Sequence, residues 1–160
     1  MADGQLPAFS STTLQRGTIK PTGITMTTNS CTIWAPRVLS ILRIVTGYCL
    51  LWHGTSKYFG MPGNAIEGLQ IFSLMGIAGL IELIAGVLLI IGLFTRSAAF
   101  VASGFTAAAY FIGHVAGKGM LLFPVMNGGE AAVLFCFIFF YLIFAGPGPW
   151  SIDALRGKSE

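Results

Sequence analysis

Residues 73–94 read SLMGIAGLIELIAGVLLIIGLF, and this stretch decides the fold of the chain. As a helix it would extend about 33 Å, which is enough to cross the hydrocarbon core of a bilayer. Glu82 lies near its middle and is its only charged residue. A charge near the bilayer midplane costs about 2.5–3.5 kcal/mol on insertion scales, so such a residue usually faces a bundle interior and serves a function. The stretch therefore predicts an integral membrane protein with a polar site inside it.

The composition of the whole chain agrees with this prediction. Hydrophobic residues make up 54% of its 160 residues, charged residues make up 9%, and the mean hydropathy is +0.78. A soluble domain has about 25% charged residues. The length suits a single domain, and the small, dispersed net charge of +3 argues against a nucleic-acid partner. Cys31, Cys49 and Cys136 do not have the spacing of metal ligands.

Four apolar segments predict four transmembrane helices. We expect these helices over residues 38–59, 73–94, 97–115 and 127–145. Only Thr95 and Arg96 separate the second from the third, which requires an antiparallel pair, and the GPGP run at 146–149 ends the last. The predicted fold is an all-α membrane protein with an antiparallel four-helix bundle over residues 37–155, followed by a short tail, 156–160.

The region before the first segment, residues 1–36, is polar and predicts a disordered tail. It lacks the apolar segment of a secretory signal peptide, and Met26 offers an alternative start. Basic residues gather on one side of the predicted spans: Arg16, Lys20, Arg37, Arg96, Arg156 and Lys158. By the positive-inside rule, both termini are predicted to be cytoplasmic. Arg43, inside the first span, is expected to extend to the lipid headgroups, and binding a headgroup or partner subunit is the alternative.

Six polar residues lie toward the other side of the predicted bundle: His53, Lys57, Glu82, His114, Asn127 and Glu130. The first two are spaced i, i+4 and the last two i, i+3, so each pair is expected to share one helix face. Glu82 lies between Gly79 and Gly86 on a stripe of small residues that allows close helix approach. The third span carries a similar stripe of Ser103, Ala107, Tyr110 and His114. These spacings predict a polar site inside the bundle.

Histidines and carboxylates beside a lysine can exchange protons and can hydrogen-bond the carbonyl of a quinone. The proton-handling catalytic candidates are Glu82, His53 and His114. The candidates for a quinone or ligand pocket are Lys57, Tyr110, Asn127 and Glu130. Flat apolar walls for a ring are expected from Tyr110, Phe111, Phe123 and Trp52.

Two other interpretations of the polar residues stay open. Lys57–Glu130 and His53–Glu82 could be buried pairs that only lock the bundle, because polar groups in a membrane must be paired whatever their role. Haem ligation by two histidines is geometrically feasible, but the chain has no C-x-x-C-H motif. No haem or metal site is predicted, since Glu-x-x-His is also missing from the sequence.

The motifs resemble those of the DoxX family of small four-helix bacterial membrane proteins. The matching stretches run from Leu42-Arg43 through Trp52-His53-Gly54 and Lys57-Tyr58-Phe59-Gly60, over residues 79–86 and 92–96, over Asn127-Gly128-Gly129-Glu130-Ala131-Ala132, and over residues 146–153. The resemblance covers residues 37–155 and implies a multi-pass protein of the bacterial cytoplasmic (inner) membrane. His53, Lys57, Glu82, Asn127 and Glu130 occupy motif positions of the family. Members are linked to sulfur oxidation at the quinone pool, as in thiosulfate:quinone oxidoreductase and terminal-oxidase subunits, and to oxidative-stress complexes.

Three functions follow as hypotheses. The first is a quinone- or quinol-binding subunit of a membrane redox complex, whose partner subunits would supply the electrons. The second is a structural or assembly subunit of a larger membrane complex. The third is a small-solute or proton pathway, which would require an oligomer or a wide cavity. Expected partners are the lipid bilayer and either other redox subunits or further copies of this chain.

Overall fold

The computed structural model of the protein describes residues 25–63 and 65–157, and every regular element in these ranges is a helix. In chain order they are α1 (Thr25–Phe59), α2 (Leu74–Ile91), α3 (Thr95–Ala109), the π-helix η1 (Tyr110–Val115), α4 (Ala116–Lys118), α5 (Pro124–Asn127), α6 (Glu130–Ala145) and α7 (Ile152–Leu155). The predicted all-α class is confirmed for the described chain. Three helices are long and apolar enough to cross a membrane, namely Ser30–Phe59, Leu74–Ile91 and the continuous run Thr95–Lys118. The chain is therefore a multi-pass membrane protein.

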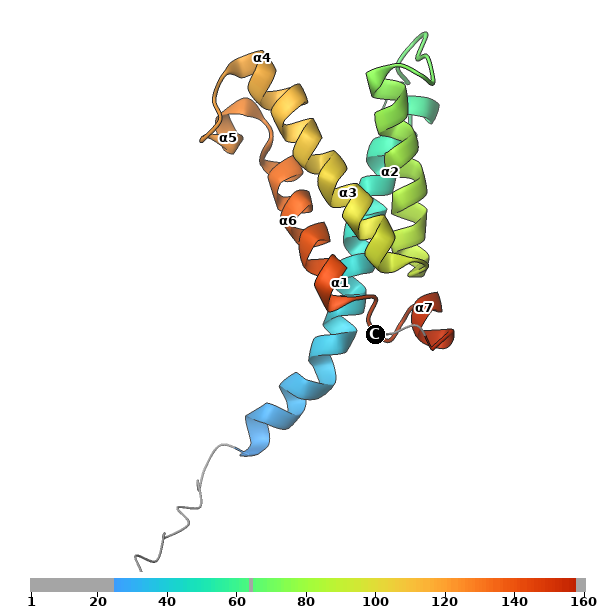
Figure 1. Cartoon of the computed structure of the whole chain (residues 1–160), viewed down its shortest axis with the longest axis vertical. Coiled ribbons are helices and arrows are strands. Elements are labelled where there is room, and N and C mark those ends of the chain that lie inside the picture. Colours follow the sequence, from blue (N-terminus) through green and yellow to red (C-terminus); the bar gives the residue numbers. More distant parts are fainter. Residues whose placement is uncertain (1–24, 64, 158–160) are drawn as a thin grey trace, which may run out of the picture.

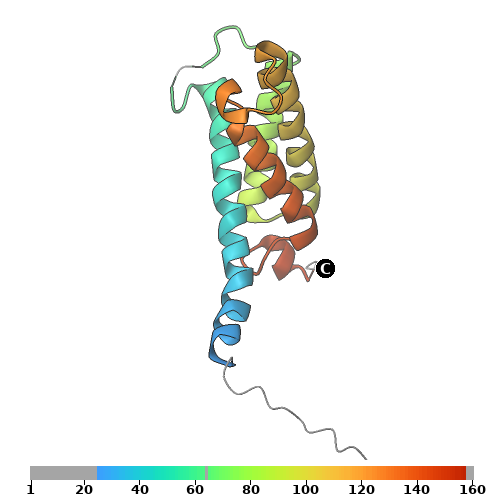
Figure 2. The ribbon, with the colours of Figure 1, turned by 90° about the vertical axis from the view of Figure 1, so that its left-hand side faces the viewer.

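The long helices form two pairs, which meet at one end and diverge at the other. α1 packs along α2, and α3 packs along α6. Figure 1 shows the pairs as the arms of a V, with the α2–α3 turn at the closed end. Seen from the side in Figure 2, the N-terminal part of α1 extends beyond the other helices. The buried core is formed by Leu50, Ala85, Leu89, Ala98, Ala99, Ala102, Phe139 and Leu142.

Glycines bring α1 and α2 into close contact. A Cβ atom on Gly54 of α1 would lie 2.8 Å from Cγ of Leu83, and one on Gly86 of α2 would lie 2.9 Å from Cα of Leu51. These approaches leave no room for a side chain, and van der Waals packing of this kind is what holds helices together in lipid. The predicted role of the small-residue stripe in close approach is therefore confirmed at Gly86.

The closed end is held by Arg43, whose side chain is fully buried. Its Nε donates to the carbonyl of Pro147 at 2.9 Å, its Nη1 donates to the carbonyls of Leu89 and Ile90, and its Nη2 donates to that of Trp150. The last carbonyls of a helix have no partner within the helix, and a guanidinium can satisfy several of them at once. The expectation that Arg43 extends to the lipid headgroups is therefore wrong. Its hydrogen-bond partners are carbonyls inside the fold, from the C-terminal end of α2 and from the segment that follows α6.

Asp153 completes the same end. Its carboxylate accepts hydrogen bonds from the backbone N–H groups of Phe94 at 2.9 Å and Thr95 at 2.8 Å, so it caps the N-terminus of α3 from 58 residues away. The turn between α2 and α3 consequently occupies residues 92–94, and the predicted connection at Thr95 and Arg96 is instead the first turn of α3. We call Arg43, Asp153 and residues 146–151, together with the α2–α3 turn that they hold, the clasp.

Two helix ends differ from the prediction. α1 begins at Thr25 and continues through Pro36, so residues 25–36 are helical, whereas the rest of the predicted tail, residues 1–24, lies outside the described residues. Extending an existing helix costs much less than nucleating one, and a single proline does not stop it here. α6 begins only at Glu130, because Gly128 adopts a left-handed conformation at φ 77° that ends α5. Its 16 residues extend about 24 Å, so a fourth membrane span stays a prediction.

Candidate functional site

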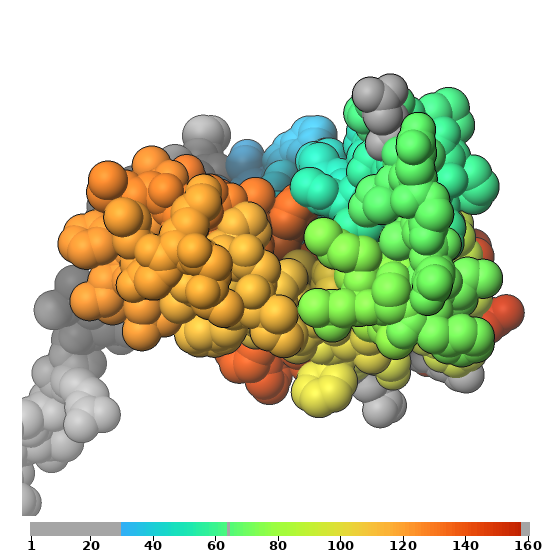
Figure 3. All heavy atoms as spheres, turned by 90° about the horizontal axis from the view of Figure 1, so that it is seen from above, coloured from blue at the N-terminus to red at the C-terminus, as the bar shows by residue number. Residues whose placement is uncertain are grey.

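A cleft of about 520 Å³ opens between the two arms, lined by residues of α1, α2, α3, η1 and α6. Figure 3, viewed from above, shows the hollow between the α3 side of the molecule and the green α2 side. The polar side chains of its wall are His53, Lys57, Glu82, Thr106 and His114. Most of the remaining wall is apolar and includes Ile81, Phe105, Ile112 and Phe135. This volume lies within the range of small-molecule pockets, about 300–1,000 Å³.

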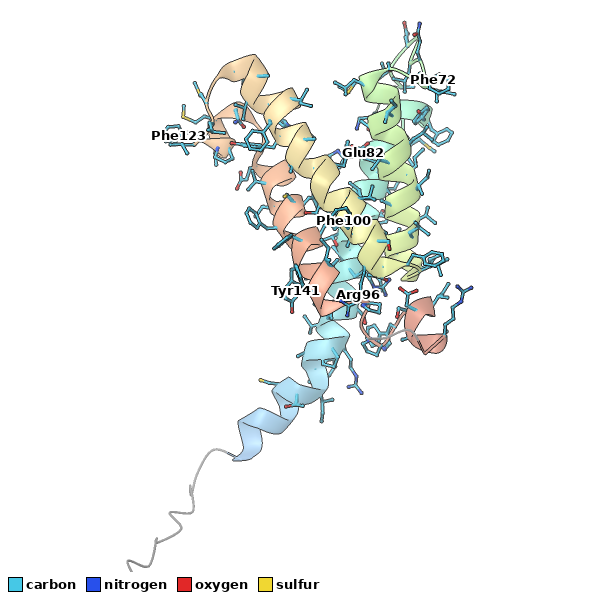
Figure 4. All side chains as sticks on the ribbon, in the orientation of Figure 1. Phe72, Glu82, Arg96, Phe100, Phe123 and Tyr141 are labelled. Carbon is cyan, nitrogen blue, oxygen red and sulfur yellow. The ribbon has the colours of Figure 1, made fainter. Side chains whose placement is uncertain are left out.

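The charged centre of the cleft is an ion pair between Lys57 of α1 and Glu82 of α2. The Lys57 ammonium lies 2.5 Å from Glu82 Oε1 and also contacts Oε2. Glu82 is only 5% exposed, and Figure 4 shows it in the space between the α2 and α3 arms. Beside this pair, Gly79 makes room for the ring of Tyr58, because a Cβ there would lie 2.7 Å from Cε2 of Tyr58. The suggested pairing of Lys57 with Glu130 is therefore wrong, since Glu82 is the partner of the lysine.

The two predicted histidines reach the cleft from different arms. His53, one turn before Lys57 on α1, is exposed to the cleft and lies edge-on to the ring of Phe135 of α6, with centroids 6.1 Å apart. His114 comes from η1 on the other arm, and its Nδ1 lies 3.3 Å from the carbonyl oxygen of Asn127. The structure thus brings His53, Lys57, Glu82 and His114 to one cavity, and their predicted roles in chemistry stay hypotheses.

Tyr110 and Asn127 are buried beside the cleft, where they hold the connection between α4 and α6. The Tyr110 hydroxyl donates to the carbonyl of Leu121 at 2.6 Å and accepts from Asn127 Nδ2 at 3.3 Å. Asn127, only 1% exposed, also donates to the carbonyl of Met120 and accepts from the Gly129 N–H. Their polar atoms are thus engaged with this connection.

Glu130 is exposed at the start of α6, whereas Asn127 ends α5, and the helix is interrupted between them at Gly128. The shared helix face expected for Asn127 and Glu130 is wrong, because the left-handed glycine separates them into two helices. The structure does not bring Glu130 to the cleft wall that the described residues form.

The aromatic walls also differ from those expected. Phe105 and Phe135 line the cleft, whereas the described lining does not include Trp52, Phe111 or Phe123. The π-helix η1 contains one more residue per turn than an α-helix would. The α-helical spacing from Ser103 to His114, on which the predicted polar stripe was based, is therefore interrupted. On α6 the sequence offered little signal, because that helix is apolar on nearly all sides and its phenylalanines look alike.

Sequence reasoning also missed Thr106. This residue is buried in the cleft wall, and its hydroxyl donates to the carbonyl of Ala102 at 2.8 Å. Threonine hydroxyls in membrane helices commonly donate to a carbonyl of their own helix. A threonine in the sequence therefore does not by itself indicate a site residue. Within the described part of the chain, no three His, Cys, Asp or Glu side chains lie close enough together to hold a metal ion.

Together these residues form a pocket that suits an amphipathic ring. The apolar walls can accept a flat hydrocarbon body, while the ammonium of Lys57 and the imidazole of His53 can donate to a carbonyl. The carboxylate of Glu82 can accept a proton or a hydrogen bond from a hydroxyl at the same point. The arrangement is thus capable of binding a ring with polar substituents and exchanging protons with it.

The fold and the site define a class, a multi-pass helical membrane protein with an ion pair in the wall of an apolar cleft. The sequence model of the DoxX family matches residues 38–115. An "Uncharacterized protein" of Haemophilus influenzae is 44% identical over 130 residues, which cover 78% of this chain and 95% of the relative. The chain belongs to the DoxX family, and the resemblance noted from its motifs is confirmed. No solved structure matches it.

Proposed function

We propose that this protein is a quinone- or quinol-binding subunit of a redox complex in the bacterial cytoplasmic membrane, with the cleft as the binding site. The observation that carries this proposal is the position of the Lys57–Glu82 pair in the wall of a cavity of about 520 Å³. A pair that served only to join α1 and α2 could be closed off by packed side chains, yet the Lys57 side chain is still 18% exposed. Charges kept accessible within a membrane span mark functional sites.

The donor set and the walls fit a quinone head group. Lys57 and His53 would hold a carbonyl oxygen from the α1 side, and Glu82 would hold or release the proton that accompanies reduction. Phe105 and Phe135 would flank the ring. A bound quinone supplies two-electron, two-proton chemistry. We assign the source of electrons to a partner subunit.

The proposal includes four membrane crossings with both termini in the cytoplasm. α6, of 16 residues, would cross with little tilt. Arg96 lies at the closed end of the molecule in Figure 4, whereas Lys57 lines the cleft between the diverging arms. The positive-inside rule then places the clasp at the cytoplasmic face and the mouth of the cleft at the opposite face.

The test is native mass spectrometry of protein gently extracted from its own membrane, with Glu82→Gln compared with Glu67→Gln. Glu67 is an exposed acid in the connection between α1 and α2, so it controls for the loss of one negative charge. We expect a bound quinone mass in the wild type and in Glu67→Gln, and its loss in Glu82→Gln. Retention of the quinone by Glu82→Gln, or no quinone in any sample, would contradict the proposal.

A structural role for the ion pair is the second candidate, and it is favoured by the direct link that the pair makes between α1 and α2. The reversed pair, Lys57→Glu with Glu82→Lys, separates the two roles. A purely structural pair keeps its yield and its complexes when reversed. The binding role instead predicts a folded protein that has lost its quinone, because the donor and the acceptor have exchanged places in the cleft.

A further inference from the structure

A second cavity, of about 450 Å³, lies between α2 and α3. We call it the α2–α3 groove and define it by Leu80, Ile84 and Leu88 on one side and by Phe94, Ser97 and Val101 on the other. Among the described residues that line it, Ser97 is the single one with a polar side chain. The groove therefore offers apolar contact and almost nothing that could bind a charged or polar group.

The groove adjoins the cleft. Ile77 and Ile81, one turn apart on α2, line both cavities. From Ile77 to Leu88 the helix rises about 16 Å, so the groove leads from the cleft toward the closed end of the molecule. In Figure 1 this is the side on which α2 and α3 converge toward their common turn. A molecule with its polar end at Glu82 could therefore extend a chain along α2.

The groove is apolar along its length, so it suits a hydrocarbon chain. A hydrocarbon chain can enter such a space entirely. The bilayer is as apolar as the groove, so the hydrophobic effect does not favour moving a hydrocarbon chain from one to the other. The affinity of the groove for such a chain would come from van der Waals packing against its fixed walls.

We infer that the α2–α3 groove holds the hydrocarbon tail of the ligand whose head group lies in the cleft. This inference rests on the proposed function and deepens it, because it names the ligand class as a lipid quinone with a long isoprenoid chain. A short, water-soluble quinone would use the cleft and leave the groove to membrane lipid. The observations that carry the inference are the shared lining at Ile77 and Ile81 and the apolar walls beyond them.

The experiment compares two valine substitutions of similar exposure. Val101 lines the groove and is 49% exposed, whereas Val87, also on the outer surface, is 46% exposed and outside both linings. Val101→Trp fills the groove, and Val87→Trp adds the same side chain elsewhere. Affinities are measured in nanodiscs, as mole fractions in the bilayer, for a benzoquinone and a naphthoquinone head group, each with and without an isoprenoid tail.

We expect the wild type and Val87→Trp to bind a tailed quinone at least about tenfold more tightly than the same head group without a tail. Val101→Trp should lose this advantage and keep its affinity for the tailless head group. Glu82→Gln should lose both ligands. If Val101→Trp keeps the full tail advantage, the groove is not the tail site, although the proposed function stands. If the wild type binds no quinone of either kind, the proposed function and this inference are both wrong.

A photoreactive group at the far end of an isoprenoid tail no longer than the groove gives an independent readout. Cross-linking in the same nanodiscs should mark the closed-end side of the groove, at Leu88 or Phe94. Labels scattered over the outer faces of α1 and α6 would overturn the inference, because they would place the tail in bulk lipid.

Discussion

At the scale of single residues, two cations within the membrane spans have different surroundings. Arg43 is fully buried and donates to four backbone carbonyls of the described chain. Its guanidinium therefore has a structural role within the fold. Lys57 has one carboxylate partner and still faces the cleft. A guanidinium has five donors in a fixed plane, whereas an ammonium is a point charge on a flexible stem. Each residue type therefore matches its role.

Arg43→Lys should destabilise the protein although it keeps the charge. A lysine at this position cannot bond the ends of α2 and of the chain at the same time, and each charged hydrogen bond contributes about 1.5–3 kcal/mol. We expect a loss of about 3 kcal/mol or more, measured as a lower melting temperature in detergent. Arg37→Lys, at an exposed site on α1, is the matched control and should melt like the wild type. Equal melting of both variants would show that the Arg43 bonds are not needed.

The site was partly predictable at this scale. A carboxylate inside an apolar segment identified Glu82, and the i, i+4 spacing placed His53 and Lys57 on one face, because both signals are local. The partner of Lys57 was not predictable, since the choice between Glu82 and Glu130 depends on how two arms diverge. Arg43 was misjudged for the same reason, as two of its partners lie more than a hundred residues away.

At the scale of helices, the α1–α2 contact depends on glycines. A Cβ at Gly54 would lie 2.8 Å from Cγ of Leu83 and 2.9 Å from its backbone nitrogen, so the helices would have to separate. At Gly104 of α3 an added Cβ meets no atom within 4 Å. These two positions show that a glycine in a transmembrane helix is not always a packing device.

Gly54→Ala should lower the free energy of unfolding by about 1–3 kcal/mol, because backbone atoms of α2 cannot move aside as a flexible side chain would. It should also weaken quinone retention, since separating α1 from α2 disturbs the Lys57–Glu82 pair. Gly104→Ala should be neutral or up to about 1 kcal/mol more stable, from helix propensity alone. Both are measured as thermal unfolding in one detergent. A Gly54→Ala protein as stable as Gly104→Ala would refute the close packing.

Hydropathy predicted the helices better than their ends. The apolar run at 73–94 contains α2, whose ends are marked by the Ser73 cap and by Gly92 at φ 69°. The N-terminal part of α1, residues 25–36, was not predicted as helix because a polar segment gives no hydropathy signal for a membrane span. The break at Gly128 and the π-helix at Tyr110–Val115 were missed because each depends on one residue in an unusual conformation or phase.

At the scale of the whole molecule, the clasp joins the first helix to the last residues described. The pKa of Asp153 is affected most by burial, which opposes its ionisation. The hydrogen bonds from Thr95 and Phe94 and the charge of Arg156 outweigh this, so its pKa lies below the usual value for an aspartate. The carboxylate therefore contributes stability above the unfolded pKa, and this contribution disappears as the pH falls through the lower folded pKa.

Asp153→Asn should melt at a lower temperature than the wild type at neutral pH, by an amount equivalent to about 1–2 kcal/mol, because an amide has one acceptor oxygen for two N–H donors. The difference should shrink as the solution becomes acidic, because the wild-type carboxyl is then protonated as well. The measurement is the melting temperature of both proteins across a pH series. A constant difference at every pH would mean that the charge of Asp153 plays no part.

Membrane topology can be tested with the two ends of the V. In a background without the native cysteines, Lys118→Cys and Arg156→Cys are labelled in intact cells with a thiol reagent that cannot cross the inner membrane. We expect Lys118→Cys to react and Arg156→Cys to react only after the membrane is permeabilised, because in the proposed topology α6 crosses between them. Identical accessibility of the two positions would show that the 16-residue α6 does not span the bilayer.

The bonds of Arg43 also set an order of events during biosynthesis. Arg43 enters the membrane with the first helix, but the carbonyls of Pro147 and Trp150 are synthesised 104 and 107 residues later. Until then a nascent chain on the ribosome holds an incompletely satisfied cation among lipids. Synthesis of residues 147–150, rather than insertion of any one helix, is therefore the step that commits the protein to its final form. A message that stops before codon 147 would yield a product for membrane proteases.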